Sequence, residues 1–528
     1  MASRMHRDMK RKRVHFVDHH HRGSRHGHLS RNKFMQLPYP RVYKPERNHT
    51  SDRGRKFLHG RPFLRVQTNQ QAQPHIQQEF PTNKGLGSGI KKLLNIIIKD
   101  LQPLSSVNIE APLSQSSIRC ELQSFYRTKR VEVQRSVNKA HNLVLSAELW
   151  SSNKNTFYLT VAGHLINENW ELKSYVLDTA HLIHKSTAES VVEQLLRISK
   201  EWNITEKTQF VVTNVDGIKR AQNNIRKWTF IPCFAFTLDK VVRETLSDWE
   251  LLLRKCQQIV AFFHQSDEAS QHLQKHRISL KLQSRELTQS SGLKWLPTFY
   301  MLKTILEQWP AIFEVFVDKR VDLCLNENER KIVDQIVKVL DVLKEATLKV
   351  GRQGFISISN IIPVVQMLQE RLRNLGMMEN RIAQKLSEKC DYHIGKINQI
   401  LWFRVCTALD PQYKTSVLRD SSIEDVKAEI KRQMRESKSV CHKSRSDESV
   451  LLNYWEMKDI SGSTLEFWRN LPEEFRKLSS VARKNLSVVS TVIPMENVHQ
   501  MKESQIINRR NCLEPENLNM ILFLNSNL

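Results

Sequence analysis

The sequence has few cysteines, and their spacing argues against two classes of small domain. The eight cysteines stand singly at positions 120, 233, 256, 324, 390, 406, 441 and 512, with no CxxC pair among them. Disulfide-stapled secreted domains and zinc fingers both depend on closely spaced cysteines. We therefore expect reduced, mostly buried thiols, no structural metal and no cofactor.

Long apolar runs are missing as well. No stretch approaches the roughly 18 apolar residues that a membrane-spanning helix needs. The first residues are also too highly charged for a secretory signal. These absences lead us to expect a soluble intracellular protein with no membrane contact.

Acidic residues are scarce relative to basic ones. The 528 residues include 81 Lys and Arg against 55 Asp and Glu, for a net charge of +26. Residues 1–70 hold 18 Lys and Arg against 4 Asp and Glu, so +14 of this charge lies there and +12 in the other 458 residues. Such a surface attracts polyanions, above all the phosphate backbone of nucleic acids. The charge predicts nonspecific attraction to DNA and no reading of its sequence.

The basic segment has little hydrophobic periodicity, and we interpret residues 1–85 as a His-rich disordered tail and linker. It contains the run Lys10, Arg11, Lys12 and Arg13. This run fits nuclear import, DNA contact or a solvated stretch of charge. The rest of the chain favours import, so we expect the protein in the nucleus.

The next part, with expected bounds 86–237, alternates strands and helices. A short apolar helix near its start is followed by segments in which β-branched and aromatic residues alternate. We predict five strands, over 142–149, 156–166, 172–178, 208–213 and 228–236. Helices are expected from Thr187 and, after the fourth strand, through Arg226. The fold class of this part is therefore α/β, with a mixed sheet and helices on its faces.

From residue 238 the helical period dominates, and we predict an all-α insertion domain over 238–450. Its clearest helix is 331–350, where apolar residues recur at helical spacing before Gly351. Residues 420–449 are rich in charge and serine and are expected to form a mobile connection. The last part, 451–528, is again helical.

Short motifs follow one another in a fixed order along residues 90–528. They include SAELW (146–150), VVTNVDGIKRA (211–221), IPCFAFTLDKVV (231–242), LKWLPTFYML (293–302), ALDPQYK (408–414) and STVIPMENVHQ (490–500). In type and order they resemble motifs of the hAT superfamily of transposases and of the zinc-finger-BED (ZBED) type proteins derived from it. The resemblance implies an RNase H-like sheet interrupted by a large helical domain, with a C-terminal dimerisation-like region that completes the core. A BED finger needs a CxxC pair together with paired histidines, and no CxxC occurs in the sequence.

The resemblance also implies a former catalytic site. Transposases of this family use two Asp and one Glu to hold two divalent ions, which activate the attacking and leaving oxygens. The matching positions here are Glu148, Asn214 and Glu496. Glu148 adds a methylene that displaces its oxygens, and Asn214 offers a neutral amide where an anion is required. Asp216 lies too far along the chain to take its place. We expect a degenerate DDE-type site and no enzyme activity.

Several of these positions also have purely structural interpretations. Glu148 can pair with a nearby base, and Asn214 can cap the helix expected after it. Lys294 and Trp295 match a family pair that holds DNA, and Trp295 can either stack on a base or lie in a helical core. The candidates for dimerisation, taken from the C-terminal resemblance, are Trp455, Phe467, Trp468, Leu478 and Leu486.

These features lead us to expect a domesticated, catalytically inactive nuclear protein that binds DNA nonspecifically or with weak specificity. Protein partners, homodimerisation and a role in transcriptional regulation fit the same picture. Two other functions stay open: residual metal-dependent nuclease or transposase activity, and a purely protein-interaction role without DNA binding. A decaying reading frame with no selected role is a further alternative.

Overall fold

The computed structural model describes thirteen stretches of the chain, which together exclude the basic tail. They are residues 84–106, 114–152, 156–182, 187–218, 220–221, 227–283, 285–290, 295–351, 357–395, 397–437, 446–460, 462–492 and 509–528. The chain divides into two units, Met1–Glu79 and Phe80–Leu528, and every described residue belongs to the second. No helix in these stretches is both long enough and apolar enough to cross a membrane.

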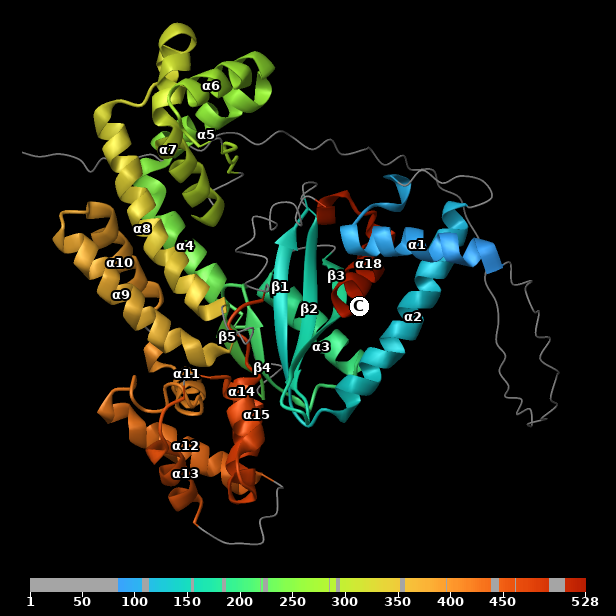
Figure 1. The fold of residues 1–528 in the computed structure, drawn as a ribbon. Coiled ribbons are helices and arrows are strands. Elements are labelled where there is room, and N and C mark those ends of the chain that lie inside the picture. Colours follow the sequence, from blue (N-terminus) through green and yellow to red (C-terminus); the bar gives the residue numbers. More distant parts are fainter. Residues whose placement is uncertain are drawn as a thin grey trace, which may run out of the picture. The chain divides into compact units, whose positions relative to one another are not determined.

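A mixed sheet forms the centre of the α/β part. Its five described strands are β1 (Leu143–Ser151), β2 (Phe157–Ile166), β3 (Leu172–Leu182), β4 (Thr208–Thr213) and β5 (Thr229–Pro232). They lie in the order β3-β2-β1-β4-β5 (Figure 1). The first three strands pair antiparallel, whereas β4 and β5 run parallel to β1. The expected mixed sheet is therefore confirmed.

Each face of the sheet is covered by its own set of helices, because apolar side chains alternate between the faces along the strands. Phe210 and Val212 belong to a core shared with the helical region, whereas Val211 belongs to a core on the other face. That second core also contains residues of α1 (Lys84–Asp100), α2 (Gln115–Lys139), α3 (Ala188–Glu201) and α18 (Pro515–Asn527). The strands are thus buried on both sides, which fixes their register.

Helices follow the sheet from Phe234 onward. Those of the first core are α4 (Phe234–Leu246), α5 (Glu250–Gln265), α6 (Asp267–Ser279), α7 (Trp295–Lys319), α8 (Glu327–Gly351), α9 (Ile361–Met377), α10 (Arg381–His393) and α11 (Leu401–Ala408). Neighbouring members of the series pack on one another, and α10 returns to α4 (Figure 1). The predicted helix 331–350 corresponds to α8, and Pro363 lies in the first turn of α9, where a proline is tolerated.

A third core holds the last helical group together. It is built on α12 (Ile423–Glu436), α13 (Asp447–Glu456), α14 (Thr464–Asn470) and α15 (Arg476–Leu486), with Ile166 from the end of β2 and Trp170 from the turn between β2 and β3. The rings of Trp170 and Trp468 stack with centroids 6.2 Å apart. The C-terminal helices therefore pack against the sheet, although the domain bounds expected at 85, 237 and 450 stay predictions.

Helix α18 covers the edge strand β3. The side chain of Asn527 accepts a hydrogen bond from the N–H of Val176 and donates one to the same residue's carbonyl, at 3.1 and 2.8 Å. Asn519 accepts a further bond from the N–H of Thr179, at 2.9 Å. These amides satisfy backbone groups that no sixth strand pairs in the described sheet.

Four local expectations differ from the structure. The fifth strand is shorter than 228–236, because α4 begins at Phe234 after Cys233. The described residues after Asn214 form turns rather than a helix. The first half of the expected mobile connection is α12, whose buried Val426, Ile430 and Met434 are spaced one turn apart among charged residues. Helix α2, 25 residues long, was not predicted.

Candidate functional site

The fold brings together two of the three positions that the resemblance assigns to a catalytic site. Ala147 of β1 pairs with Thr213 of β4, so Glu148 and Asn214 follow side by side on two parallel strands. Ligand sites in such sheets form where parallel strands end. Glu496 lies outside the described residues, so its position relative to the pair stays a prediction.

The Asn214 side chain is bound to the backbone of β1. Its amide oxygen accepts a hydrogen bond from the N–H of Leu149 at 2.9 Å, and its amide nitrogen donates to the carbonyl of Leu149 at 2.9 Å. Thr213 adds a bond from its hydroxyl to the carbonyl of Ala147, at 2.9 Å. The Asn214 side chain therefore continues the hydrogen bonding between β4 and β1 just beyond the end of β4. It caps no helix in the described stretches.

Glu148 faces a cation from the C-terminal part of the chain. Arg510 donates to its carboxylate at 3.2 Å, and both side chains are largely buried. The guanidinium carbon of Arg510 also lies 5.5 Å from the centre of the Trp150 ring. The structure thus gives Glu148 the basic partner that its structural interpretation requires.

The charges at this end of the sheet do not fit a pair of divalent ions. A two-metal site needs several anionic oxygens around the ions. Of the two described positions only Glu148 carries a carboxylate, and the guanidinium of Arg510 already pairs with it. Asp216 points to Lys240 instead, at 3.2 Å, and its side chain is 77% exposed. Within the described stretches no three His, Cys, Asp or Glu side chains gather in a metal-binding group.

A cavity of about 330 Å³ lies beside these residues, at the ends of β4 and β5. Asn214, Asp216, Arg220, Lys240 and His393 line it, together with apolar residues such as Phe236. His393 shares a hydrogen bond with Glu244, 2.9 Å away. The neighbouring Cys233 is buried, and burial raises the pKa of its thiol, so it is a poor nucleophile. The cavity contains cations but no activated nucleophile.

A buried histidine that sequence reasoning missed ties three strands together near Glu148. His164 of β2 lies 2.8 Å from the hydroxyl of Ser146 in β1 and 2.8 Å from that of Ser174 in β3. Burial lowers its pKa to about 4. The neutral ring donates at one nitrogen and accepts at the other, so it serves as a cross-strand link. Only a polar residue inside an apolar strand, TVAGHLI, signalled it in the sequence.

The other predicted site residues fall in two groups. Trp295 begins α7 and is 5% exposed in the helical core, whereas Lys294 and the run Lys10 to Arg13 lie outside the described residues. Among the dimerisation candidates, Trp468, Leu478 and Leu486 are buried inside one chain, and Trp455 and Phe467 pack partly exposed against them. In this conformation the three buried side chains offer no surface to a partner, and dimerisation through this set stays a prediction.

Comparisons with known families agree with this arrangement of sheet and helices. Residues 146–230 match the ZBED1 RNase-like domain and residues 231–339 its helical domain. Residues 437–528 match the hAT family C-terminal dimerisation region. The chain is a hAT transposase-derived, ZBED-like protein. Its expected fold class, an RNase H-like sheet with a large helical region, is confirmed.

The ZBED-like chain has distant relatives among curated proteins. It is 20% identical to human zinc finger BED domain-containing protein 4 over 82% of its own length and 41% of that protein. It is 22% identical to the maize protein named "Putative AC transposase", over 51% of the chain and 36% of the relative. Human zinc finger BED domain-containing protein 6 is 21% identical over 53% and 31%. The chain thus spans less than half the length of these relatives.

Proposed function

We propose that this ZBED-like chain acts by binding DNA and protein partners in the nucleus and does not cut DNA. The observation that carries the proposal is the bonding of Asn214 and Glu148. One side chain is committed to the backbone of Leu149 and the other to Arg510. Divalent ions would have to displace both sets of contacts and would still lack an anion at position 214.

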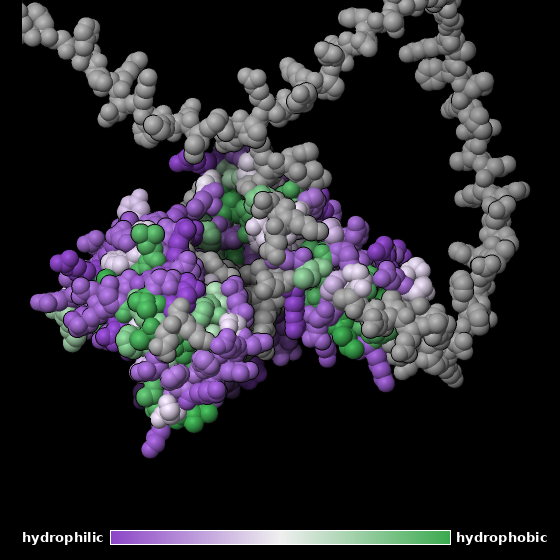
Figure 2. All heavy atoms as spheres, turned by 90° about the horizontal axis from the view of Figure 1, so that it is seen from above, coloured by the Kyte–Doolittle hydropathy of each residue, from purple (hydrophilic) through white to green (hydrophobic). Residues whose placement is uncertain are grey.

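The charge of the chain supports DNA as one partner. The excess of basic residues persists beyond the first 70 residues, so the phosphate backbone meets cations over much of the chain. Figure 2 shows hydrophilic side chains over most of the visible face, with hydrophobic ones in separate patches. No base-reading element follows from these features, and we propose nonspecific or weakly specific binding, with transcriptional regulation as one use.

A nicking experiment tests the absence of cleavage. The full chain is incubated with supercoiled DNA and Mg²⁺ or Mn²⁺, beside Glu148→Ala and Glu496→Ala variants. We expect the same background for all three proteins. Metal-dependent nicking by the wild type that disappears in both variants would establish residual nuclease activity and overturn the proposal.

A salt titration tests DNA binding. The logarithm of the binding constant of the full chain for a labelled duplex should fall linearly with the logarithm of salt concentration, with a slope set by the number of phosphates contacted. The same measurement on a chain without residues 1–70 shows how much of that slope the tail supplies. Weak binding that salt does not change would favour a purely protein-interaction role.

A second copy of the chain is the partner that the family match supports most directly. Residues 437–528 match the hAT dimerisation region, and α13 to α15 belong to it. We propose a homodimer through exposed residues of this region. Sedimentation velocity of the full chain over a range of concentrations measures it, and a monomer throughout would contradict it.

A further inference from the structure

A cavity of about 280 Å³ lies near the first residue of β1, whereas Glu148 lies toward the other end of that strand. It is formed by the end of α2, the turn between β2 and β3, and α15, which contacts β2 (Figure 1). We call it the α15 cavity. Its charged and titratable lining residues are Lys139, His141, Glu168, Lys173, Tyr175, Arg483 and Lys484.

The two cations from α15 have no acidic partner in direct contact. Across the described stretches, neither the guanidinium of Arg483 nor the ammonium of Lys484 takes part in an ion pair or a hydrogen bond. Both are only partly exposed. The guanidinium of Arg483 lies over the Trp170 ring, 4.6 Å from its centre, and its Nε is buried without a hydrogen-bond partner. The arginine is therefore held in place by an aromatic ring while its donors stay unused.

Burial makes these charges costly in the free protein. It lowers the pKa of Lys484 and that of Arg483, although the carboxylates of Glu436 and Glu429 partly oppose the change for the lysine and that of Glu168 partly opposes it for the arginine. Lys173 differs, because it has an ion pair with Glu171 at 3.0 Å. An anion in the cavity would offset the cost of burying the two unpaired cations.

The other lining residues indicate which anion fits. Ser136, Asn142 and Asn169 add neutral hydrogen-bond donors beside the cations, whereas the amide of Asn167 already donates to Glu171 at 2.9 Å. A phosphate group has several oxygens that can accept from such a mixed set at once, and arginine binds phosphate through two N–H groups together. The volume admits a phosphate with part of its sugar but no base pair.

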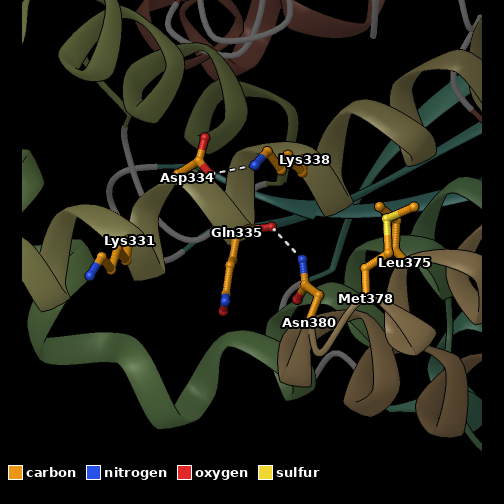
Figure 3. Close-up of a pocket in the computed structure, with 7 residues that line it drawn as sticks. All are labelled: Lys331, Asp334, Gln335, Lys338, Leu375, Met378 and Asn380. Carbon is orange, nitrogen blue, oxygen red and sulfur yellow. Dashed lines mark hydrogen bonds and ion pairs between the residues drawn. The ribbon is translucent and has the colours of Figure 1, made fainter.

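A comparison with another basic cavity shows what distinguishes the α15 cavity. A cavity of about 230 Å³ beside α8 and the turn between α9 and α10 also contains two lysines (Figure 3). There Lys338 pairs with Asp334 at 2.7 Å, and Lys331 pairs with Glu327 at 2.8 Å. Those lysines are neutralised within α8, so they do not call for an external anion.

We propose that the α15 cavity binds a backbone phosphate of DNA. The inference rests on the DNA binding proposed above and gives it a location. The phosphate contacts Arg483 and Lys484 directly, while the more exposed Lys139 extends the positive surface along the strand. This contact lies away from the former catalytic position, so DNA held here does not need to reach Glu148.

Duplex binding by charge-removing variants tests the location. The full chain, a double variant Arg483→Gln/Lys484→Gln, and a control Lys331→Gln/Lys338→Gln with the same change in net charge are titrated with a labelled duplex over a range of salt. We expect the double variant to lower the salt slope by about 1 and the affinity at low salt by roughly tenfold. The control should keep the wild-type slope.

Each result decides a separate point. A wild-type chain without salt-dependent binding overturns the proposed DNA function itself. Steep binding by the wild type that the double variant shares overturns only the α15 cavity as the contact. An equal loss in the double variant and the control also overturns it, because net charge alone would then explain the effect.

Inorganic phosphate provides a second probe. At equal ionic strength, phosphate should raise the melting temperature of the wild-type chain more than chloride does, and this difference should vanish in the double variant. Protection by phosphate together with unchanged DNA binding in the double variant would identify a smaller phosphorylated ligand and overturn the assignment to DNA. If loss of the Trp170 contact unfolds the double variant, Lys484→Gln alone, compared with Lys484→Arg, keeps the test: only the glutamine should weaken binding.

Discussion

The side-chain amide of Asn214 hydrogen bonds to both the N–H and the carbonyl of Leu149, so a single residue joins two strands at the point where transposases carry a metal-binding acid. An amide can do this because it combines a donor with an acceptor, whereas an ionised carboxylate has acceptors alone. A carboxylate of the same shape accepts from the N–H, but its second oxygen is negative and repels the carbonyl oxygen of Leu149. An amide rather than an acid at position 214 thus has a structural consequence as well as a chemical one.

Asn214→Asp is therefore expected to destabilise the protein rather than restore an active site. The loss of the bond to the Leu149 carbonyl should lower the free energy of unfolding by about 1–3 kcal/mol at neutral pH. Urea denaturation measures the change, with Asn214→Ala as a control for the loss of both bonds. An Asp variant as stable as the wild type would contradict the role given to the amide.

The ion pair between Arg510 and Glu148 is expected to stabilise the fold mainly because removal of the arginine leaves a partly buried carboxylate without a cation. Arg510→Gln should lower the free energy of unfolding by about 1–3 kcal/mol. The double variant Glu148→Gln/Arg510→Gln has neither charge of the ion pair. Its loss in the free energy of unfolding should therefore be smaller than the summed losses of Glu148→Gln and Arg510→Gln. A double-mutant cycle measures this coupling, and strictly additive losses would show that the pair contributes nothing.

His164 is expected to make stability depend on pH in mildly acidic solution. Its pKa is about 4 in the folded protein, below its ordinary value of 6.5, so the unfolded chain takes up the proton first. The free energy of unfolding should hence fall as pH drops from about 6.5 to about 4, by roughly 3 kcal/mol in total. Carboxylates titrate in the same range, so the quantity to compare is the slope of wild type against His164→Asn. Equal slopes would mean that His164 is protonated in the folded state.

The motif ALDPQYK is expected to stabilise the fold through its aspartate. Asp410 is buried, and its carboxylate accepts hydrogen bonds from the hydroxyls of Ser359 and Thr464, at 2.7 and 2.8 Å. Asp410→Ala leaves both hydroxyls without their acceptor and should cost about 2–4 kcal/mol, whereas Asp410→Asn keeps an acceptor and should cost less. Thermal unfolding shows which of the two variants is less stable. An Ala variant as stable as the Asn variant would contradict the stabilising role given to the Asp410 hydrogen bonds.

Local patterns in the sequence predicted the sheet well and its ends less well. The strand from 208 to 213 was predicted with its observed bounds, because a short apolar run stands between polar turns. The fifth strand was predicted too long, since the apolar residues at its end continue unbroken into the buried face of α4. Period alone does not separate a strand from a helix over so few residues.

Contacts between distant residues were beyond the reach of the sequence. The alteration of Glu148 was visible, but its partner Arg510 lies 362 positions away and stands beside another arginine with no distinguishing pattern. The α15 cavity was hidden as well, because its lining residues lie at 136–175 and at 483–484, far apart in the sequence. Burial of Trp468, Leu478 and Leu486 was equally hidden, because an apolar set looks alike whether it faces a partner or its own chain.

The two hydrogen bonds between the Asn527 side chain and the backbone of Val176 have a consequence for the solubility of the protein. Without α18, β3 would present its free N–H and carbonyl groups at the rim of the sheet, beside the apolar surface that the helix now covers. Proteolytic removal of α18 would therefore turn a shielded rim into a template on which other chains can pair. Such a fragment should be prone to form inclusion bodies and should be a preferred substrate for chaperones, even though most of its helices and strands would be intact.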